Sequence, residues 1–167
     1  GHLCLGTLHS NNANQTLDRI INFFPEERRN QLLMDLSSNM KAIISQRLIR
    51  TQDGKGRRAA IEIMLNTPLI SDLILKGEFH ELKAIMAKSR ELGMQTFDQA
   101  LFELYNQGEI SYEEALRNAD STNELRLQIK LKSNRQDNAA VGESTQFSML
   151  QKPKPEEKSA ENQPVAE

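Results

Sequence analysis

The sequence has few of the residues on which several common kinds of site depend. Of its 167 residues, one is cysteine and none is tryptophan, and aromatic residues make up 5%. A single cysteine excludes an internal disulfide, and the scarcity of aromatic residues disfavours a stacking surface for single-stranded nucleic acid. Because Cys4 lies in an apolar run, we expect it to be a small core residue of a protein in a reducing compartment.

Neither sign of charge dominates the sequence. It has 21 basic and 23 acidic residues, which gives a formal net charge of −2. A broad basic surface for nucleic acid is therefore not expected, and Arg57 and Arg58 in a basic turn are a weak candidate for such a contact. No run of the sequence approaches the ~20 apolar residues of a membrane-spanning helix.

Two familiar signatures of catalytic sites are also missing. The phosphate-binding pattern G-x-x-x-x-G-K-[S/T] does not occur, and the nearest segment, residues 54–58, lies in an expected hairpin turn without the Ser or Thr that binds magnesium. The chain has three histidines and no H-E-x-x-H spacing, so no metal site is predicted.

The first stretch of the sequence is its most informative part. Residues 1–9 predict a buried strand bracketed by His2 and His9, and the polar residues 10–12 are typical of a helix start. Ligands bind at the carboxyl ends of strands in α/β sheets, and an imidazole there can donate a hydrogen bond to a phosphate. The spacing alone favours a capping or core histidine. Since the sequence begins at the element predicted to be most buried, we expect it to be part of a longer domain.

Two helices and a hairpin are predicted next. Apolar spacing predicts a helix over 14–24 and a second one that begins at Pro25. Strands are expected at 42–49 and 58–65, joined by a glycine-rich turn. This antiparallel pair is expected to extend the sheet begun by residues 1–9. Alternation places the residues of the second strand on two faces, with Ile61, Ile63 and Leu65 on one and Glu62 and Met64 on the other.

From Thr67 onward the pattern is helical. The first of these helices follows Thr67 and is expected to turn inward Leu69, Ile70, Leu73 and Ile74. Further helices are predicted at about 81–92, after a capping box at Thr96 and after a second box at Ser111. A last segment is predicted as either helix or strand, because its apolar residues alternate over 125–131.

Residues 133–167 differ in composition from the rest of the chain. They are rich in proline and in polar and charged residues, so we expect a disordered tail. An apolar cluster in it, formed by Phe147, Met149 and Leu150, could be a docking peptide, but an idle tail is favoured.

Several segments of the chain together resemble one family. GHLCLGTLHSNNANQTLDRIINFFP resembles the histidine box of the secretion and type IV pilus ATPases. The resemblance continues through PEERRNQLLMDLSSNMKAIISQRLIR, DGKGRRAAIEIMLNTP and GMQTFDQALFELYNQGEISYEEALRNAD, and so covers about residues 1–132. Within that family the chain resembles the PilT/PilU retraction branch, and within this branch it resembles the PilU members most.

The resemblance implies a fold and a function. It implies an α/β chain in which residues 1–66 are the second half of a RecA-like P-loop ATPase core, namely a strand, two helices and a β-hairpin. Residues 67–132 are then a small helical subdomain, and 133–167 a disordered tail. The family forms rings of six subunits that hydrolyse ATP at subunit boundaries, on the cytoplasmic side of the inner membrane, and drive pilus retraction and twitching motility. His2 and His9 match two histidines that look towards the γ-phosphate in the family.

One segment departs from the retraction branch. After Thr-Pro the family pattern reads A-I-R-N-L-I-R-E, whereas this chain reads LISDLILK. The apolar positions of this motor element are kept at Ile70, Leu73 and Ile74. Ser71 and Leu75 replace the two arginines, which removes two guanidinium forks. This favours an accessory retraction ATPase that acts with a paralogous retraction ATPase. The resemblance also implies the inner-membrane pilus platform protein as a partner, and the balanced charge gives no reason to expect nucleic acid.

The family's P-loop, Asp box and Walker B segment precede the histidine box, and this sequence contains none of them. ATP and Mg2+ are therefore expected to be bound mainly by upstream residues, and these 167 residues alone are expected not to hydrolyse ATP. The alternative is a non-enzymatic interaction module that docks on the motor ring or the platform protein.

Overall fold

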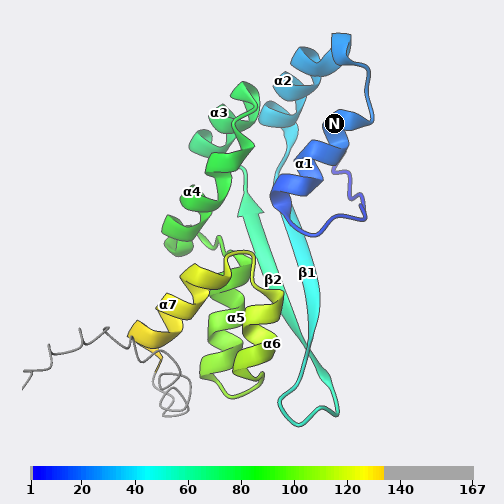
Figure 1. The fold of residues 1–167 in the computed structure, drawn as a ribbon. Helices are drawn as coiled ribbons and strands as arrows, with labels where there is room; N and C mark the ends of the chain where they lie inside the picture. Colours follow the sequence, from blue (N-terminus) through cyan, green and yellow to red (C-terminus); the bar gives the residue numbers. More distant parts are fainter. Residues whose placement is uncertain (1, 134–167) are drawn as a thin grey trace, which may run out of the picture. The chain divides into compact units, whose positions relative to one another are not determined.

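The computed structural model of the chain describes residues 2–133, and Figure 1 shows the order of its elements. The helices are α1 (Ala13–Asn22), α2 (Arg29–Asn39), α3 (Pro68–Lys76), α4 (Leu82–Lys88), α5 (Phe97–Asn106), α6 (Tyr112–Asn118) and α7 (Thr122–Lys132). The strands are β1 (Ala42–Arg50) and β2 (Arg57–Leu65). Short 3-10 turns lie at Glu26–Arg28, Phe79–Glu81 and Arg90–Leu92.

The two strands form the predicted antiparallel hairpin. They are paired from Ala42 opposite Leu65 to Arg50 opposite Arg57. One face of the hairpin is buried, through Ile43, Ser45 and Ile49 of β1 and Ala60, Glu62 and Met64 of β2. At the turn Gly54 has a φ of +68°, a conformation that glycine adopts without steric cost. Period-two alternation and turn chemistry thus predicted this element correctly.

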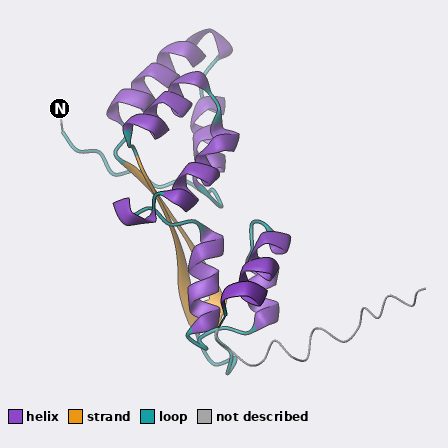
Figure 2. Cartoon of the chain, turned by 90° about the vertical axis from the view of Figure 1, so that its left-hand side faces the viewer, coloured by secondary structure: helices purple, strands orange, loops and turns teal. Residues whose placement is uncertain are grey.

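Residues 2–9, which we call the histidine loop, do not form the predicted strand. They form neither helix nor strand, and their side chains are exposed, as Leu3 (78%) and Leu5 (90%) illustrate. Cys4 is exposed as well, so its assignment to the core is wrong. The expected extension of the sheet is also wrong, because the sheet of the described residues has two strands, β1 and β2, and residues 2–9 pair with neither. A strand buried on both faces needs neighbouring strands and covering helices, and Figure 2 shows this segment as a loop leading to α1.

Most predicted helix ends are confirmed by their caps. The side chain of Thr67 accepts a hydrogen bond from the Ile70 N–H, and Thr96 forms a complete capping box with Gln99. Gly77 ends α3 with a φ of +74°, the left-handed conformation that favours glycine after a helix.

Three details of the helices differ from the prediction. α1 ends at Asn22 instead of residue 24. The helix expected over 81–92 is interrupted at Ser89, whose φ of −111° and ψ of 36° leave helical geometry, so α4 and a 3-10 turn replace it. Leu69 is half exposed, because the buried stripe of α3 is formed by Ile70, Leu73 and Ile74.

Two hydrophobic clusters hold the described residues together. The first joins α1, α2, α3 and α4 to the end of the hairpin that contains Ile43 and Met64. The second joins α5, α6 and α7 to the half nearer the turn, through Ile49 and Ala60. β1 and β2 contribute to both clusters, so the hairpin is the element that the two groups of helices share (Figure 1). The predicted division of the chain at residue 66 stays a prediction.

The end of the described range settles one open alternative. Residues 125–131 lie within α7, with Leu125 and Ile129 buried at helical spacing, so the segment is helix and not strand. Apart from Ser133, which follows α7, the tail predicted from residue 133 onward lies outside the described residues, together with its apolar cluster. Over residues 2–133, every helix is too short or too polar to span a bilayer.

Candidate functional site

The histidine loop carries both histidines that the sequence singled out. His2 and His9 lie at its two ends, and both side chains are exposed. Ser10, directly after the loop, donates its N–H to the Leu8 carbonyl at 3.1 Å. The guanidinium of Arg19, in α1, donates a hydrogen bond to the His9 carbonyl. The His9 backbone is therefore fixed by α1, while its imidazole stays available to a ligand.

Polar side chains at the start of α1 fix the backbone that follows the loop. The Asn12 side chain accepts a hydrogen bond from the Gln15 N–H at 2.9 Å and so caps the helix. The hydroxyls of Ser10 and Thr16 are 2.6 Å apart. The sequence predicted this helix start correctly from residues 10–12.

A buried carboxylate from β2 holds the first residue of α1. Glu62 is 1% exposed, and its Oε1 accepts a hydrogen bond from the Ala13 N–H at 2.7 Å. Its Oε2 has no hydrogen-bond partner among the described residues. Burial, and then the charge of Asp120, raise the pKa of Glu62 above its usual range, although the Ala13 N–H acts in the opposite sense. Sequence reasoning placed Glu62 on a strand face without a role; a lone acid in the apolar run AAIEIML was the available signal.

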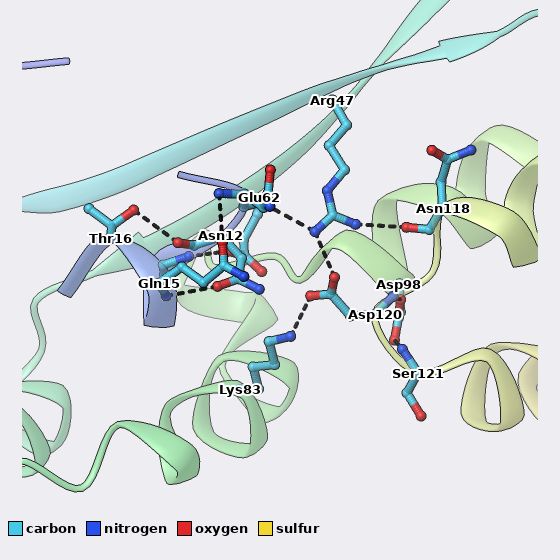
Figure 3. Close-up of polar contacts among 12 residues, drawn as sticks. Asn12, Gln15, Thr16, Arg47, Glu62, Lys83, Asp98, Asn118, Asp120 and Ser121 are labelled. Atoms are coloured by element: carbon cyan, nitrogen blue, oxygen red, sulfur yellow. Dashed lines mark hydrogen bonds and ion pairs between the residues drawn. The ribbon is translucent and has the colours of Figure 1, made fainter. Parts of the chain in front are cut away.

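An arginine from β1 joins the same backbone to a distant loop. Arg47 Nη2 lies 3.2 Å from the Asn11 carbonyl, and Nη1 lies 2.7 Å from the Asn118 carbonyl. Nη2 also pairs with Asp120 Oδ1 at 2.7 Å. The guanidinium carbon lies 4.0 Å from the centre of the Phe97 ring, a cation–π distance. Figure 3 shows the contacts of Arg47 with Asn118 and Asp120. The sequence gave no means to find the hydrogen bonds of Arg47, because their partners lie 36 to 73 residues away.

The loop between α6 and α7 is fixed by further charged groups. Asp120 also binds Lys83 of α4, and the carboxylate of Asp98 accepts hydrogen bonds from the N–H groups of Asp120 (2.8 Å) and Ser121 (3.0 Å). Burial acts to raise the pKa of Asp120, but hydrogen bonds from Lys83 and Arg47 outweigh it and hold that pKa below its usual range. Burial raises the pKa of Asp98. We call Arg47, Glu62, Lys83, Asp98 and Asp120 the polar network.

The positions that the sequence assigned to a motor element lie in the core. Ile70 and Ile74 are 0% exposed and Leu73 is 7% exposed, and all three belong to the first hydrophobic cluster. The two positions without the family's arginines differ from each other. Ser71 donates its hydroxyl hydrogen to the Ser37 carbonyl at 2.7 Å, while Leu75 is 47% exposed. The structure does not bring this element together with His2 or His9.

The described residues do not form a complete site for a nucleotide with its metal. No group of three acidic, histidine or cysteine side chains is placed to hold a metal ion within the described range. A depression of about 410 Å³ lies beside the hairpin turn, lined by Thr51, Gln52, Asp53, Arg58, Gly108 and Glu109. Arg58 is paired there with Glu109 at 2.7 Å, and the two carboxylates in the lining oppose an anionic ligand. The described residues therefore do not fit Mg2+, and the exposed imidazoles of His2 and His9 are the candidates for contact with a phosphate.

Comparison with known proteins decides the family. A model described as "Type II/IV secretion system protein" matches residues 1–117. The chain belongs to the type II/IV secretion system protein family. Among its relatives, type IV pilus ATPase PilU of Pseudomonas aeruginosa is 68% identical over 133 residues, which are 80% of this chain and 35% of PilU. Type IV pilus retraction ATPase PilT of the same organism is 40% identical over 119 residues, 71% of this chain and 34% of PilT.

Solved structures agree with this family and with the predicted fold class. The crystal structure of the pilus retraction motor PilT with bound ADP superposes with a TM-score of 0.67 at 35% identity, covering 76% of this chain and 35% of that one. The resemblance seen in the histidine box is thus confirmed, as is the carboxyl-terminal part of a secretion-ATPase domain. This secretion-family chain spans about a third of the length of the curated relatives it matches.

Proposed function

We propose that this chain is the carboxyl-terminal part of an ATP-hydrolysing motor that powers type IV pilus retraction and twitching motility, as an accessory retraction ATPase. The observation that carries the proposal is the 68% identity to the type IV pilus ATPase PilU over 80% of the chain. The PilT relative is a retraction ATPase by name, and the structural neighbour is a retraction motor with ADP bound.

Within such a motor the chain's own contribution is the histidine loop. An exposed imidazole at His9 can donate a hydrogen bond to a phosphate oxygen, and Arg19 and the start of α1 fix the backbone from which it projects. His2 lies at the other end of the same loop and would act in the same way. We assign both residues to sensing of the γ-phosphate. The P-loop and Mg2+ would supply charge neutralisation for phosphoryl transfer, through residues upstream of this chain.

The α3 surface supports the accessory role. The exposed positions of α3 include Leu69 and Leu75, together with the ion pair of Asp72 and Lys76 at 2.7 Å. Two guanidinium forks of the PilT pattern have no counterpart there, and a single lysine does not replace their planar, bidentate contacts. The motor is accordingly proposed to act with a paralogous retraction ATPase.

The proposed oligomeric state and partners rest on the same family membership. We propose a homo-hexameric ring on the cytoplasmic side of the inner membrane, bound to the pilus platform protein and not to nucleic acid. The balanced charge of the chain, −2 overall, supports the last point, because nucleic-acid binding rests on an excess of positive charge.

The intact mass of the natural protein in a cell extract tests the proposal. We expect a species well above 19.0 kDa, because the relatives are about three times as long as the matched region. That species, once purified, should release phosphate from ATP, whereas the 167-residue chain should not. A natural product of 19.0 kDa would instead support the interaction module, and ATP turnover by the 167-residue chain would contradict the assignment of ATP binding to upstream residues.

A further inference from the structure

We propose that Arg47 is a positioning residue that ties the backbone just after the histidine loop to the loop between α6 and α7, so that the two segments are displaced together. Its guanidinium binds the carbonyl of Asn11, two residues after His9, and the carbonyl of Asn118, at 3.2 and 2.7 Å. These acceptors are 107 residues apart in the sequence. Asn11 lies in the loop before α1, and Asn118 is the last residue of α6 (Figure 3).

The shape of the side chain suits this task. A guanidinium offers several N–H donors in one rigid plane, so it can bind acceptors on different segments at once, which a lysine ammonium at the end of a flexible stem does less well. The guanidinium carbon lies over the Phe97 ring, 4.0 Å from the ring centre, and this contact restricts the plane. Asp120 binds the same guanidinium at 2.7 Å and is 13% exposed, so the charge is paired where water screens it little.

Each of the two segments has a second anchor on a regular element. Glu62 of β2 binds the Ala13 N–H, and Asp98 of α5 binds the N–H groups of Asp120 and Ser121. None of these three N–H groups is hydrogen-bonded to Arg47 among the described residues. Their protection from solvent exchange therefore reports the position of each segment and not the loss of an Arg47 contact itself.

The linkage has a consequence that rests on the proposed function. If the His9 imidazole binds the γ-phosphate, a change at that phosphate displaces the histidine loop. This displacement reaches Asn11, two residues after His9, and is transmitted through Arg47 to Asn118. The carboxyl-terminal helices α6 and α7 would then respond to the nucleotide although they are distant from it in the sequence.

Amide hydrogen exchange on the 167-residue chain tests the linkage without any nucleotide. Arg47→Met removes the donors but keeps an apolar stem over Phe97. We expect exchange to accelerate at least about tenfold at both Ala13 and Asp120, because Arg47→Met removes one charged hydrogen bond from the first segment and two from the second. Lys83→Met perturbs one segment alone, because Lys83 binds Asp120 but does not contact Asn11. With Arg47 in place this variant should accelerate exchange at Asp120 and, to a smaller extent, at Ala13, whereas adding it to Arg47→Met should not accelerate exchange at Ala13 any further.

Acceleration at only one of the two amides in Arg47→Met, or at Asp120 alone in Lys83→Met, would overturn the linkage. If Arg47→Met does not fold, Arg47→Lys decides, since it keeps the charge beside Asp120 without the span to Asn11. Loss of protection at Ala13 with Asp120 still protected supports the proposal, and unchanged protection at Ala13 overturns it. Turnover of the full-length motor is a separate measurement, so failure of the proposed function would show as inactive wild-type protein with the exchange result intact.

Discussion

The histidine loop and the rest of the described chain are held by different means. Residues 13–133 are built on two hydrophobic clusters with a hairpin between them, whereas the loop exposes Leu3, Leu5 and Leu8 and is held at its end by hydrogen bonds. The residues with the strongest functional expectation thus lie on the part of the chain with the least packing. In such a region substitutions should alter function with little effect on folding, and in the clusters the reverse should hold.

The largest expected difference is between matched apolar truncations in the two regions. Ile74→Ala removes a fully buried side chain of the first cluster and should lower the free energy of unfolding by about 3 kcal/mol. Leu5→Ala removes a side chain that is 90% exposed and should stay within about 0.5 kcal/mol of the parent. Urea denaturation of the 167-residue chain measures both. Equal losses would mean that the histidine loop packs in solution against residues 13–133, which we call the body. The two regions would then not differ in how they are held.

Helix caps should have a smaller effect within the body. Thr96→Ala removes the hydroxyl that caps α5 and accepts from the Gln99 N–H, but keeps the backbone N–H that donates to the Gln99 side chain; it should cost about 1 kcal/mol. Ser121 is the matched control, because it occupies the same position before α7 but makes no side-chain capping bond. Ser121→Ala should therefore cost less, and thermal unfolding followed by circular dichroism compares the two. A larger loss in Ser121→Ala would contradict the capping geometry.

The two regions also differ in how far the sequence could predict them. The hairpin and the helices after Thr67 follow from local rules, since alternation, caps and glycine at positive φ act over a few residues. Residues 1–9 have the apolar content of a strand, but a strand also needs partners, and no rule within nine residues reveals whether these are present. The polar network was missed for a related reason: Arg47 and Asp120 lie 73 residues apart and each has an ordinary local context. Glu62, a lone acid in an apolar strand, was the one signal.

The buried carboxylate of the network gives an effect of pH that only the body should show. Burial and Asp120 raise the pKa of Glu62, so the folded chain holds this proton longer than the unfolded chain, whose glutamate titrates near 4.3. The contribution of Glu62 to stability is complete below that value and is lost as pH rises through the folded pKa. Glu62→Gln, which keeps an acceptor for the Ala13 N–H, should become more stable relative to the parent as pH is raised from about 4 to 7.

Urea unfolding at a series of pH values measures this change, with Glu113→Gln as the control at an exposed position. A constant difference between Glu62→Gln and the parent across the range would count against a raised pKa. Asp120 contributes in the opposite direction, because its pKa is lowered, and its stabilisation is lost as pH falls. Substitution of Glu62 alone separates the two, since Arg47 and Lys83 still bind Asp120.

The smallest effect on folding is expected at the residue with the largest proposed role. The His9 side chain is exposed, and the contact that fixes this position is made by its carbonyl, so His9→Ala keeps the hydrogen bond from Arg19. The melting temperature of the 167-residue chain should therefore not change, whereas ATP turnover by the full-length motor should fall at least tenfold if the imidazole binds the γ-phosphate. Arg19→Gln complements it, because it frees the His9 backbone and leaves the imidazole intact. If His9→Ala lowers the melting temperature along with turnover, His9 is a structural residue, and the histidine loop no longer stands apart from the body.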